Sequence, residues 1–260
     1  PAGVFQEHLA LLAGAGVELE VAAVGGDLAL KWGSKAGKRY NLRSSVDLTD
    51  DPVTWPVFSG FENLEATPDE NTLTFARPAD PERYFVIEEF QPPPVVVYAT
   101  DFEEGAVGWT TLVNDESANT SWELGTPAGS TGPLAGAAGS ANAWSTNLGD
   151  YGPDSNISLR SPAIDLSGIP EAGLSFEAYR DADGFGDAAV VRFLRASDLV
   201  QLGAEVAVGM DVFDNDWTTI RISIVPEAIG ETVLIEWNFT SDDTPDSFSG
   251  LSIDDVRVSD

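Results

Sequence analysis

The sequence predicts an all-β protein made of a small antiparallel sandwich followed by a larger jelly-roll sandwich. Short runs in which apolar and polar residues alternate, separated by turns, recur from residue 17 to the end of the chain. No convincing helical pattern interrupts these runs in the second part. Three consecutive prolines, Pro92–Pro94, divide the 260 residues into two parts, and a hydrophobic fraction of 43% supplies each part with a core.

Residues 1–16 are expected to be an N-terminal arm or the end of an upstream region. Phe5, Leu9 and Leu12 recur at helical spacing. Two alternatives stay open: the segment docks locally, or it is an extended arm that pairs with a neighbouring copy of the chain. Because Pro1 is not a natural start, we expect the chain to be a processed or excised piece.

Residues 17–90 have the pattern of a small antiparallel sandwich. In Val17–Val21 the apolar residues fall on one face and Glu18 and Glu20 on the other. Gly25–Asp27 has the composition of a tight hairpin turn. The expected strands lie at residues 17–21, 28–32, 37–43, 55–58, 72–75 and 83–87.

Residues 91–97 are the expected linker, because consecutive prolines favour a stiff, extended chain. The second domain then covers residues 98–260. Residues 125–156 are rich in small and polar residues and are predicted to be loop-like, with 143–148 embedded in them. About eight or nine strands in one domain indicate a jelly roll. The later strands are expected at residues 157–159, 174–179, 189–194, 217–225, 232–239 and 253–258.

The composition limits the partners and the chemistry. With 43 acidic and 13 basic residues, the net charge of −30 opposes binding to nucleic acid and to anionic membranes, and it suits a saline medium or divalent cations. The plain alternative is a solvated acidic surface without a specific partner. Cysteine is absent and His8 is the only histidine, so thiol catalysis and a Ser-His-Asp site have almost no raw material. No apolar run is long enough to span a bilayer.

The first domain resembles a known module. The segments that carry the resemblance are residues 30–34, 37–42, 45–48, Trp55 and residues 83–86. They look like a fibronectin-III-like module of the kind found in large secreted proteins of planctomycete and verrucomicrobial type. This resemblance implies a spacer or interaction module without catalysis.

The second domain carries a further series of short motifs. In chain order they are residues 101–105, 108–109, 121–127, 144–148, Tyr151, 161–166 and 253–256. Their order resembles a MAM-type domain, in the bacterial form found downstream of secreted metallopeptidases of the immune-inhibitor-A type. The resemblance implies a jelly roll, calcium on the N- and C-terminal strands, and an adhesive or accessory role. The absence of cysteine favours the bacterial branch, and the peptidase unit with its His-Glu motif is absent from this sequence.

Carboxylates at both ends of the second domain form the first candidate metal site. Asp101 and Glu103 are two residues apart and project from the same face of a strand. If the first and last strands lie side by side, these groups crowd against Asp254 and Asp255, and calcium between them relieves the repulsion. Adjacent residues face opposite ways unless a bulge turns one of them. Asp242, in an acidic turn before the last strand, is a further candidate ligand. The alternative is a solvated acidic strand end.

A second, weaker candidate metal site is the segment from Asp181 to Asp187. Asp181, Asp183 and Asp187 surround an Asp-x-Asp-Gly core that is similar to a calcium loop. The EF-hand pattern fails because no glutamate follows at the twelfth position. A tight acidic turn between two strands is the alternative.

Aromatic residues form the candidate ligand-binding site. Trp144 and Tyr151, in the predicted long loop, are the best candidates for a platform on which sugar rings stack. The alternative is that they belong to the core, as aromatic residues of sandwiches usually do.

We therefore expect a non-catalytic, calcium-stabilised adhesion or interaction module, part of a larger secreted or cell-surface bacterial protein. The expected partners are other surface or matrix proteins or polysaccharide, and copies of the chain through residues 1–16. The alternatives are a carbohydrate-binding accessory module of a secreted hydrolase and a structural subunit of an extracellular filament.

Overall fold

The computed structural model describes residues 17–245 and 247–260. Residues 1–16, the expected arm, lie outside the described residues. The chain divides into two compact units, Pro1–Pro93 and Pro94–Asp260, and the division falls within residues 91–97. The described residues form antiparallel sheets and three short 3-10 helices, which confirms the all-β fold class.

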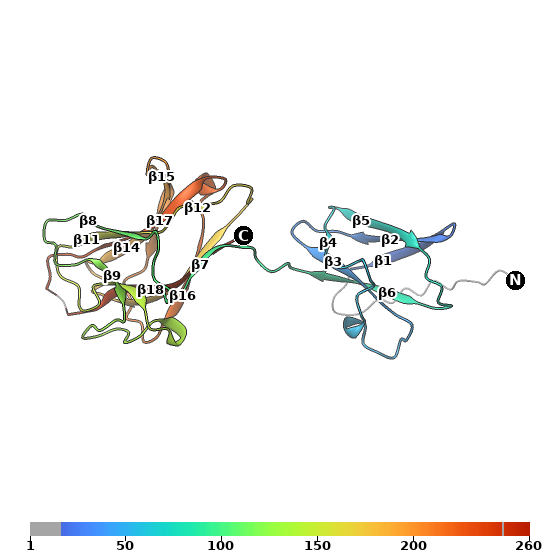
Figure 1. Cartoon of the computed structure of the whole chain (residues 1–260), viewed down its shortest axis with the longest axis horizontal. Helices are drawn as coiled ribbons and strands as arrows, with labels where there is room; N and C mark the ends of the chain where they lie inside the picture. Colours follow the sequence, from blue (N-terminus) through green and yellow to red (C-terminus); the bar gives the residue numbers. More distant parts are fainter. Residues whose placement is uncertain (1–16, 246) are drawn as a thin grey trace. The chain divides into compact units, whose positions relative to one another are not determined.

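The first unit contains two three-stranded sheets, ordered β1-β2-β5 and β4-β3-β6 (Figure 1). Gly25, with a φ of 65°, and Gly26 join β1 to β2 as a two-residue turn, because Val24 pairs with Asp27. The strands are β1 (Leu19–Val24), β2 (Asp27–Gly33), β3 (Arg39–Ser45), β4 (Leu64–Glu65), β5 (Glu70–Ala76) and β6 (Tyr84–Phe90). The strand expected at residues 55–58 is replaced by the 3-10 helix η1 (Pro52–Thr54) and a single bridge between Arg43 and Val57.

The core of the first unit follows the period of two. Leu28, Leu30 and Trp32 of β2 are buried and alternate with more exposed residues. Tyr40 and Leu42 of β3 are buried in the same cluster. Both sheets therefore place one apolar face in the core.

The second unit is a sandwich of two larger sheets (Figure 1). The β18 sheet has the order β16-β13-β18-β10-β9, with β7 on β18, and the β17 sheet has the order β15-β14-β17-β11-β8, with β12 on β17. The elements are β7 (Val96–Thr100), β8 (Thr110–Val113), β9 (Trp122–Gly125), η2 (Ala137–Gly139), β10 (Ala143–Thr146), β11 (Asn156–Arg160), β12 (Ile164–Asp165), β13 (Gly173–Asp181), β14 (Ala188–Arg195), β15 (Gln201–Val208), β16 (Thr218–Ser223), η3 (Pro226–Ala228), β17 (Thr232–Thr240) and β18 (Gly250–Ser259).

The segment 125–156, expected to be loop-like, contains a strand. β10 lies between β9 and β18, and all four of its residues are buried. A strand that is covered on both faces shows no alternation of polar and apolar residues, so its sequence pattern does not identify it.

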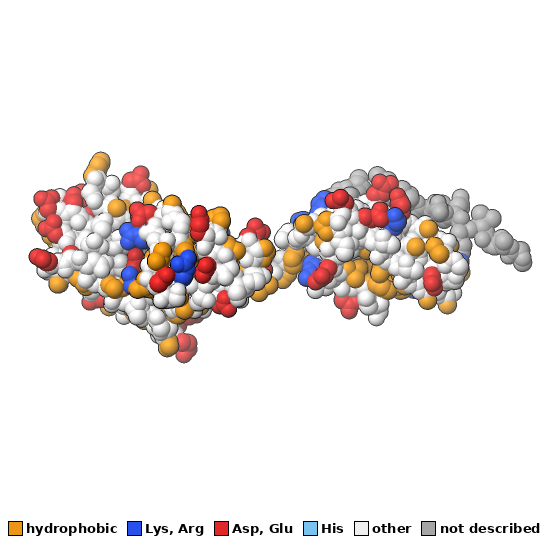
Figure 2. Space-filling model, turned by 90° about the horizontal axis from the view of Figure 1, so that it is seen from above, with side chains coloured by type: hydrophobic (Ala, Val, Ile, Leu, Met, Phe, Trp, Pro, Cys, Tyr) orange, Lys and Arg blue, Asp and Glu red, His pale blue; other side chains and the backbone are white. Residues whose placement is uncertain are grey.

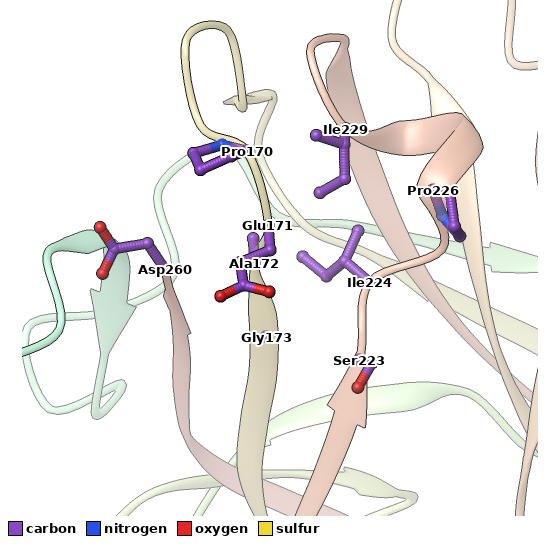
Figure 3. A pocket seen from close by; sticks show the side chains of 9 residues that line it. All are labelled: Pro170, Glu171, Ala172, Gly173, Ser223, Ile224, Pro226, Ile229 and Asp260. Atoms are coloured by element: carbon purple, nitrogen blue, oxygen red, sulfur yellow. The ribbon is translucent and has the colours of Figure 1, made fainter. Parts of the chain in front are cut away.

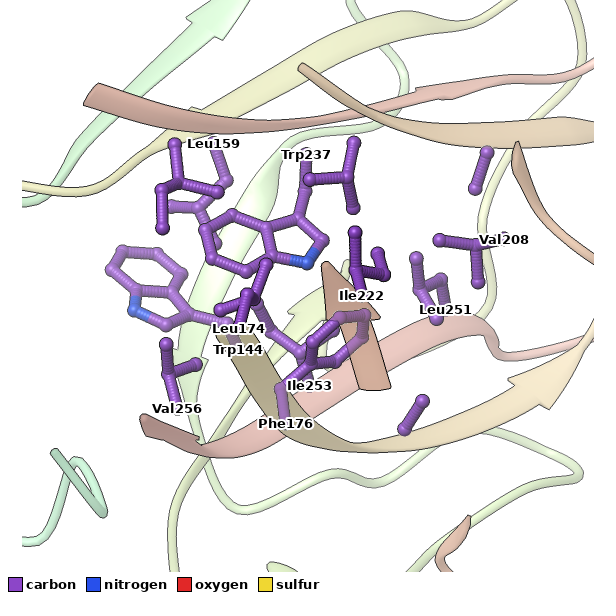
Figure 4. Close-up of a cluster of buried hydrophobic side chains, with 14 of the residues drawn as sticks. Trp144, Leu159, Leu174, Phe176, Val208, Ile222, Trp237, Leu251, Ile253 and Val256 are labelled. Atoms are coloured by element: carbon purple, nitrogen blue, oxygen red, sulfur yellow. The ribbon is translucent and has the colours of Figure 1, made fainter. Parts of the chain in front are cut away.

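Large aromatic residues from both sheets meet in the core of the second unit (Figure 4). Trp237 on β17 meets Phe176 on β13 edge-to-face, with ring centroids 5.6 Å apart. Trp237 also packs against Trp109, at 5.6 Å. Aromatic contacts of this kind add to the free energy that burial of the rings contributes.

Candidate functional site

The first and last strands of the second unit meet at a seam. β7 pairs antiparallel with β18, and Thr100 lies opposite Val256. Asp101 directly follows β7, so it lies next to Asp255 across the seam. The expectation that the two ends of the jelly roll lie side by side is confirmed.

A β-bulge separates Asp254 from Asp255. On β13, Ser175 pairs with Arg257 and Glu177 with Asp254, so two residues of β18 oppose a single residue of β13. Asp255 takes a left-handed conformation, with a φ of 46°. As a result Asp254 is fully buried while Asp255 is exposed.

The buried Asp254 carboxylate binds both ends of the short helix η2. Its Oδ2 accepts hydrogen bonds from the Ala137 backbone N–H at 2.8 Å and from the Ser140 hydroxyl at 2.7 Å. Its Oδ1 accepts from the N–H of Asp255 at 2.7 Å. Burial raises the pKa of Asp254, and these three hydrogen bonds oppose that rise.

Glu103 fastens the same segment from the turn that follows β7; because β7 ends at Thr100 and Phe102 has a φ of 59°, Asp101 and Glu103 do not share a strand face as expected. Its Oε1 accepts hydrogen bonds from the N–H groups of Ala141, at 3.1 Å, and Asn142, at 2.7 Å. Asp254 and Glu103 thus hold neighbouring parts of the chain between residues 137 and 142. The pKa of Asp255 is raised by burial first and then by the charges of Asp101 and Glu177. Negative charge therefore gathers at the seam.

Three oxygens converge beside Gly136. An ideal Cβ at this glycine would lie 2.1 Å from Ser140 Oγ, 2.5 Å from the Asn142 carbonyl oxygen and 2.7 Å from Asp254 Oδ2. Hydroxyl, carbonyl and carboxylate oxygens are the ligands that calcium prefers, so the donor chemistry fits this cation. Among residues 17–245 and 247–260, however, no three Asp, Glu or His side chains are gathered in a metal-binding arrangement.

The second candidate metal site is a hydrogen-bonded cluster. Asp181 Oδ2 accepts from the Thr131 hydroxyl at 2.5 Å and from the Ser249 N–H at 3.0 Å and hydroxyl at 2.9 Å. Asp187 Oδ2 accepts from the Tyr151 hydroxyl. Asp183 accepts a hydrogen bond only from within its own turn, from the Phe185 N–H at 3.1 Å. Asp181 and Asp187 are buried and fasten loops together.

Asp242 belongs to this second cluster and not to the seam. Its N–H donates to Asp187 Oδ1 at 3.0 Å. Asp181, in the same cluster, pairs with Gly250, which lies four residues before Asp254 on β18, or about 13 Å along an extended strand. The structure therefore groups Asp242 with the β13–β14 turn, and the sequence position before the last strand did not reveal this.

Trp144 and Tyr151 do not form an exposed platform. Only 8% of Trp144 and 3% of Tyr151 is accessible, so neither ring presents a face to a sugar, and this prediction is wrong. Trp144 packs against Phe102 and Trp109 in the core, and Tyr151 packs edge-to-face on Phe239. Large rings fill the space between two sheets better than any other side chain, which accounts for their burial.

The exposed aromatic side chains lie elsewhere, at one end of the second unit. Phe185, at the tip of the β13–β14 turn, is fully exposed, and Phe213 is 58% exposed. The Phe213 ring stacks at a tilt on Phe248, with centroids 5.2 Å apart. We call this end, formed by residues 182–187, 209–217, 242–245 and 247–248, the loop end. An apolar residue between two glycines in an otherwise acidic turn was the sequence signal for Phe185.

The backbone of the loop end is held firmly. Arg180 forms a bidentate ion pair with Asp214, at 2.8 and 3.0 Å, and Phe213 forms a bridge with Asp181. A Cβ on Gly184 would lie 2.4 Å from the Asp211 Cα, and one on Gly186 would lie 1.9 Å from an Asp242 carboxylate oxygen. Gly184 is required by the close approach of the Asp211 backbone, and a Cβ at Gly186 would displace the Asp242 carboxylate, so the two glycines let the turn pack on both neighbouring loops.

The outward face of the β17 sheet is polar. Glu236 binds Arg160 at 2.6 Å and Arg192 at 3.1 Å, and Arg192 continues to Glu205 at 2.8 Å. Within the strands of this sheet every aromatic side chain points into the core. This face therefore offers ion pairs and amides but no ring for stacking.

A surface depression of the second unit lies beside the ends of β13 and β16 (Figure 3). It is open, has a volume of about 540 Å³, and includes Pro170, Ile224 and Ile229 in its lining. Glu171 and Asp260 also line it, and both are exposed. Active sites are usually enclosed clefts with convergent polar groups, and this open depression differs from them.

No protein-family model and no curated protein matches the sequence. Among solved structures, the K3 adhesin domain of Lys-gingipain from Porphyromonas gingivalis is 19% identical, with a TM-score of 0.45 over 64% of this chain and 100% of that chain. The CBM22-1 xylan-binding domain of Paenibacillus barcinonensis Xyn10C is 14% identical, with a TM-score of 0.38 over 64% of this chain and 94% of that chain. An enzymatically active tailspike domain of bacteriophage CBA120 is 14% identical, with a TM-score of 0.42 over 61% of this chain and 20% of that chain.

These neighbours are adhesin, carbohydrate-binding and enzymatic domains. Their likeness to this chain is too distant to carry an argument about ligand or activity. The fibronectin-III-like and MAM-type resemblances stay predictions. In the described part of the chain no helix has the length and apolar character needed to cross a membrane.

Proposed function

We propose that this chain is a non-catalytic interaction module of an extracellular or cell-surface protein, with a role in adhesion. The observation that carries the proposal is the loop end, where Phe185 and Phe213 are exposed on a firmly held backbone. Exposed apolar side chains that cluster on loops are typical of binding surfaces.

The arrangement suits binding for a thermodynamic reason. Burial of two phenylalanine side chains against a partner contributes about 1.5–3 kcal/mol each. Because the ion pair of Arg180 with Asp214 and the close packing of Gly184 already order the loops, little conformational entropy is lost on binding. Aromatic anchors of this kind commonly dominate the affinity of an interface.

Substitution of the two rings tests the proposal. The double variant Phe185→Ser/Phe213→Ser and the wild type are applied to arrays of extracellular-matrix proteins, polysaccharides and random peptides. We expect the wild type to bind at least one class of ligand and the double variant to lose at least about tenfold in affinity. Leu134→Ser, which changes another exposed apolar residue of the same unit, is the matched control and is expected to bind as the wild type does. Equal binding by the double variant, or no binding by the wild type, contradicts the proposal.

We also propose that calcium binds at the seam and stabilises the second unit. Two observations support the proposal. The like charges of Asp101 and Asp255 lie close enough to repel each other. Oxygens of Asp254, Ser140 and the Asn142 carbonyl converge beside Gly136. A cation there would neutralise charge that burial makes costly. In the weaker site, Asp183 is the residue with the most unused acceptor capacity, since Asp181 and Asp187 are already bound by neighbouring donors.

Carbohydrate binding is the second candidate function, and one observation favours it. Trp217 and Tyr179 form an edge-to-face pair, with centroids 6.0 Å apart, and both rings are half-buried at the surface. A partly exposed tryptophan offers a flat apolar face to a sugar ring. Loss of glycan-array binding in Trp217→Ala, with Trp144→Phe unaffected, is the expected result; silence of the wild type on the array removes this candidate.

A further inference from the structure

We propose that the loop end binds a cationic polypeptide segment in which an apolar side chain is flanked by lysine or arginine. This inference rests on the proposed function, because it names the chemistry of the partner that the loop end takes.

Carboxylates surround the two exposed rings on every loop of the loop end. One lies in the β13–β14 turn, three lie in residues 209–217, and two lie in the turn before β18. The residues are Asp183, Asp211, Asp214, Asp216, Asp242 and Asp243. Among the described residues, the basic side chain that contacts these loops is Arg180, and its guanidinium is already paired with Asp214.

Several of these carboxylates are available to a partner. Asp211 and Asp243 are exposed, and no hydrogen bond or ion pair occupies their side chains in the described structure. Asp183 and Asp216 each accept only a local backbone N–H, at 3.1 and 2.8 Å. The rim of the aromatic surface thus keeps carboxylates with acceptor capacity for a partner, whereas the buried Asp181 of the neighbouring cluster is already bound by Thr131 and Ser249.

The charge of the whole unit reinforces this local pattern. Residues 94–260 carry 28 acidic residues against six arginines and no lysine. Arg160, Arg180, Arg192 and Arg195 are engaged in ion pairs with carboxylates of the unit. Figure 2 shows the result on one face, where acidic side chains are widespread and basic ones are few. Such a field attracts cations and repels anionic polymers.

The apolar and charged features together select one class of partner. Phe185 and Phe213 require an apolar group, and the rim of Asp183, Asp211 and Asp243 favours positive charge around that group. A neutral glycan gains nothing from the carboxylate field, and an anionic glycan is repelled by it. Charge complementarity of this type raises the association rate and selects among partners, and it weakens as salt is added.

Selection from a random peptide library against the full chain tests the inference. The selection is done at 0.05 M NaCl, once with a chelator and once with 2 mM calcium chloride. We expect the enriched peptides to contain an aromatic or aliphatic residue next to at least two lysines or arginines. Their affinity should fall at least about tenfold between 0.05 and 0.5 M NaCl.

Three variants report on the surface. We expect Phe185→Ser/Phe213→Ser and Asp211→Asn/Asp243→Asn each to weaken the selected peptides at least about tenfold, and Leu134→Ser to leave them unchanged. All of these side chains are exposed, and unchanged melting of each variant shows that the fold is retained. Enriched peptides without basic residues, an affinity that does not respond to salt, or failure to enrich any peptide overturns the inference.

The outcomes separate this inference from the proposed function. If a glycan or an uncharged peptide binds and Phe185→Ser/Phe213→Ser abolishes that binding, the loop end is an interaction surface and only the cationic partner is excluded. If the substitution changes no ligand's affinity, both fall. If calcium abolishes peptide binding, the carboxylates act as metal ligands and the cationic partner is overturned.

Discussion

Replacement of Asp254 gives the sharpest stability prediction, because its carboxylate is fully buried and accepts three hydrogen bonds. In Asp254→Ala the buried N–H of Ala137 loses its acceptor, which costs about 1–3 kcal/mol. The half-buried Ser140 hydroxyl also loses its acceptor, at a cost of about 0.5–1 kcal/mol, since it is able to turn towards water. Loss of the buried charge offsets part of this. We expect a net decrease of about 2–3 kcal/mol in the free energy of unfolding of the second unit.

Asp254→Asn is the matched control for this prediction. Its amide oxygen still accepts from Ala137 and Ser140, while the N–H of Asp255 loses its acceptor and the buried charge is removed; these two changes oppose each other, so we expect it to change stability by no more than about 1 kcal/mol. Urea unfolding in the presence of a chelator, followed by tryptophan fluorescence, measures both variants. If Asp254→Ala and Asp254→Asn differ by less than about 0.5 kcal/mol, the carboxylate does not anchor residues 137–140 as we infer.

Three further results are expected. Trp237→Ala should destabilise the second unit by about 3–5 kcal/mol in urea unfolding, and Trp237→Phe by less, because it retains ring contacts and removes an indole N–H that has no partner. Gly184→Ala should lower both stability and ligand binding, because its Cβ would meet the Asp211 backbone. Gly149→Ala is the control and should change neither, because open space surrounds Gly149. Retained binding in Gly184→Ala argues against a rigid loop end. In chelator, Asp255 should make stability fall as pH rises, because burial raises the pKa of its carboxyl in the folded protein above the ordinary value. Between the unfolded and folded pKa values the folded protein binds more protons than the unfolded chain, and the stabilising contribution is lost above that window. Unfolding of Asp255→Asn at pH 4 and pH 7 checks this, and an equal effect at both pH values is the contrary outcome.

Local patterns in the sequence were sufficient for the seam. The sequence left open whether Asp254 and Asp255 face opposite ways or a bulge turns one of them, and the structure has a bulge here, with Asp254 buried and Asp255 exposed. The antiparallel pairing of the first and last strands followed from the general closure of sandwiches, and the register places Asp101 next to Asp255. Both inferences depend only on side-chain period and strand order.

The loops were beyond the reach of the sequence pattern, because their neighbours are set by long-range packing. Asp242 contacts Asp187, 55 residues earlier, through the fold of two turns. Trp144 lies on a strand that is covered on both faces, so its burial has no periodic signal. Exposure of Phe185 depends on how Gly184 and Gly186 pack against other loops, which no local propensity encodes.

Calorimetric melting of the full chain with and without calcium tests most directly whether calcium binds at the seam. At a calcium concentration about 100 times Kd, stabilisation of about 2.7 kcal/mol should raise the Tm of the second unit by about 5–10 °C. The shift should disappear in Asp101→Asn/Asp255→Asn, persist in Asp183→Asn, and not be reproduced by magnesium at the same concentration. An unchanged Tm in calcium, or the same shift in Asp101→Asn/Asp255→Asn as in the wild type, would contradict a bound cation between the two ends of this unit.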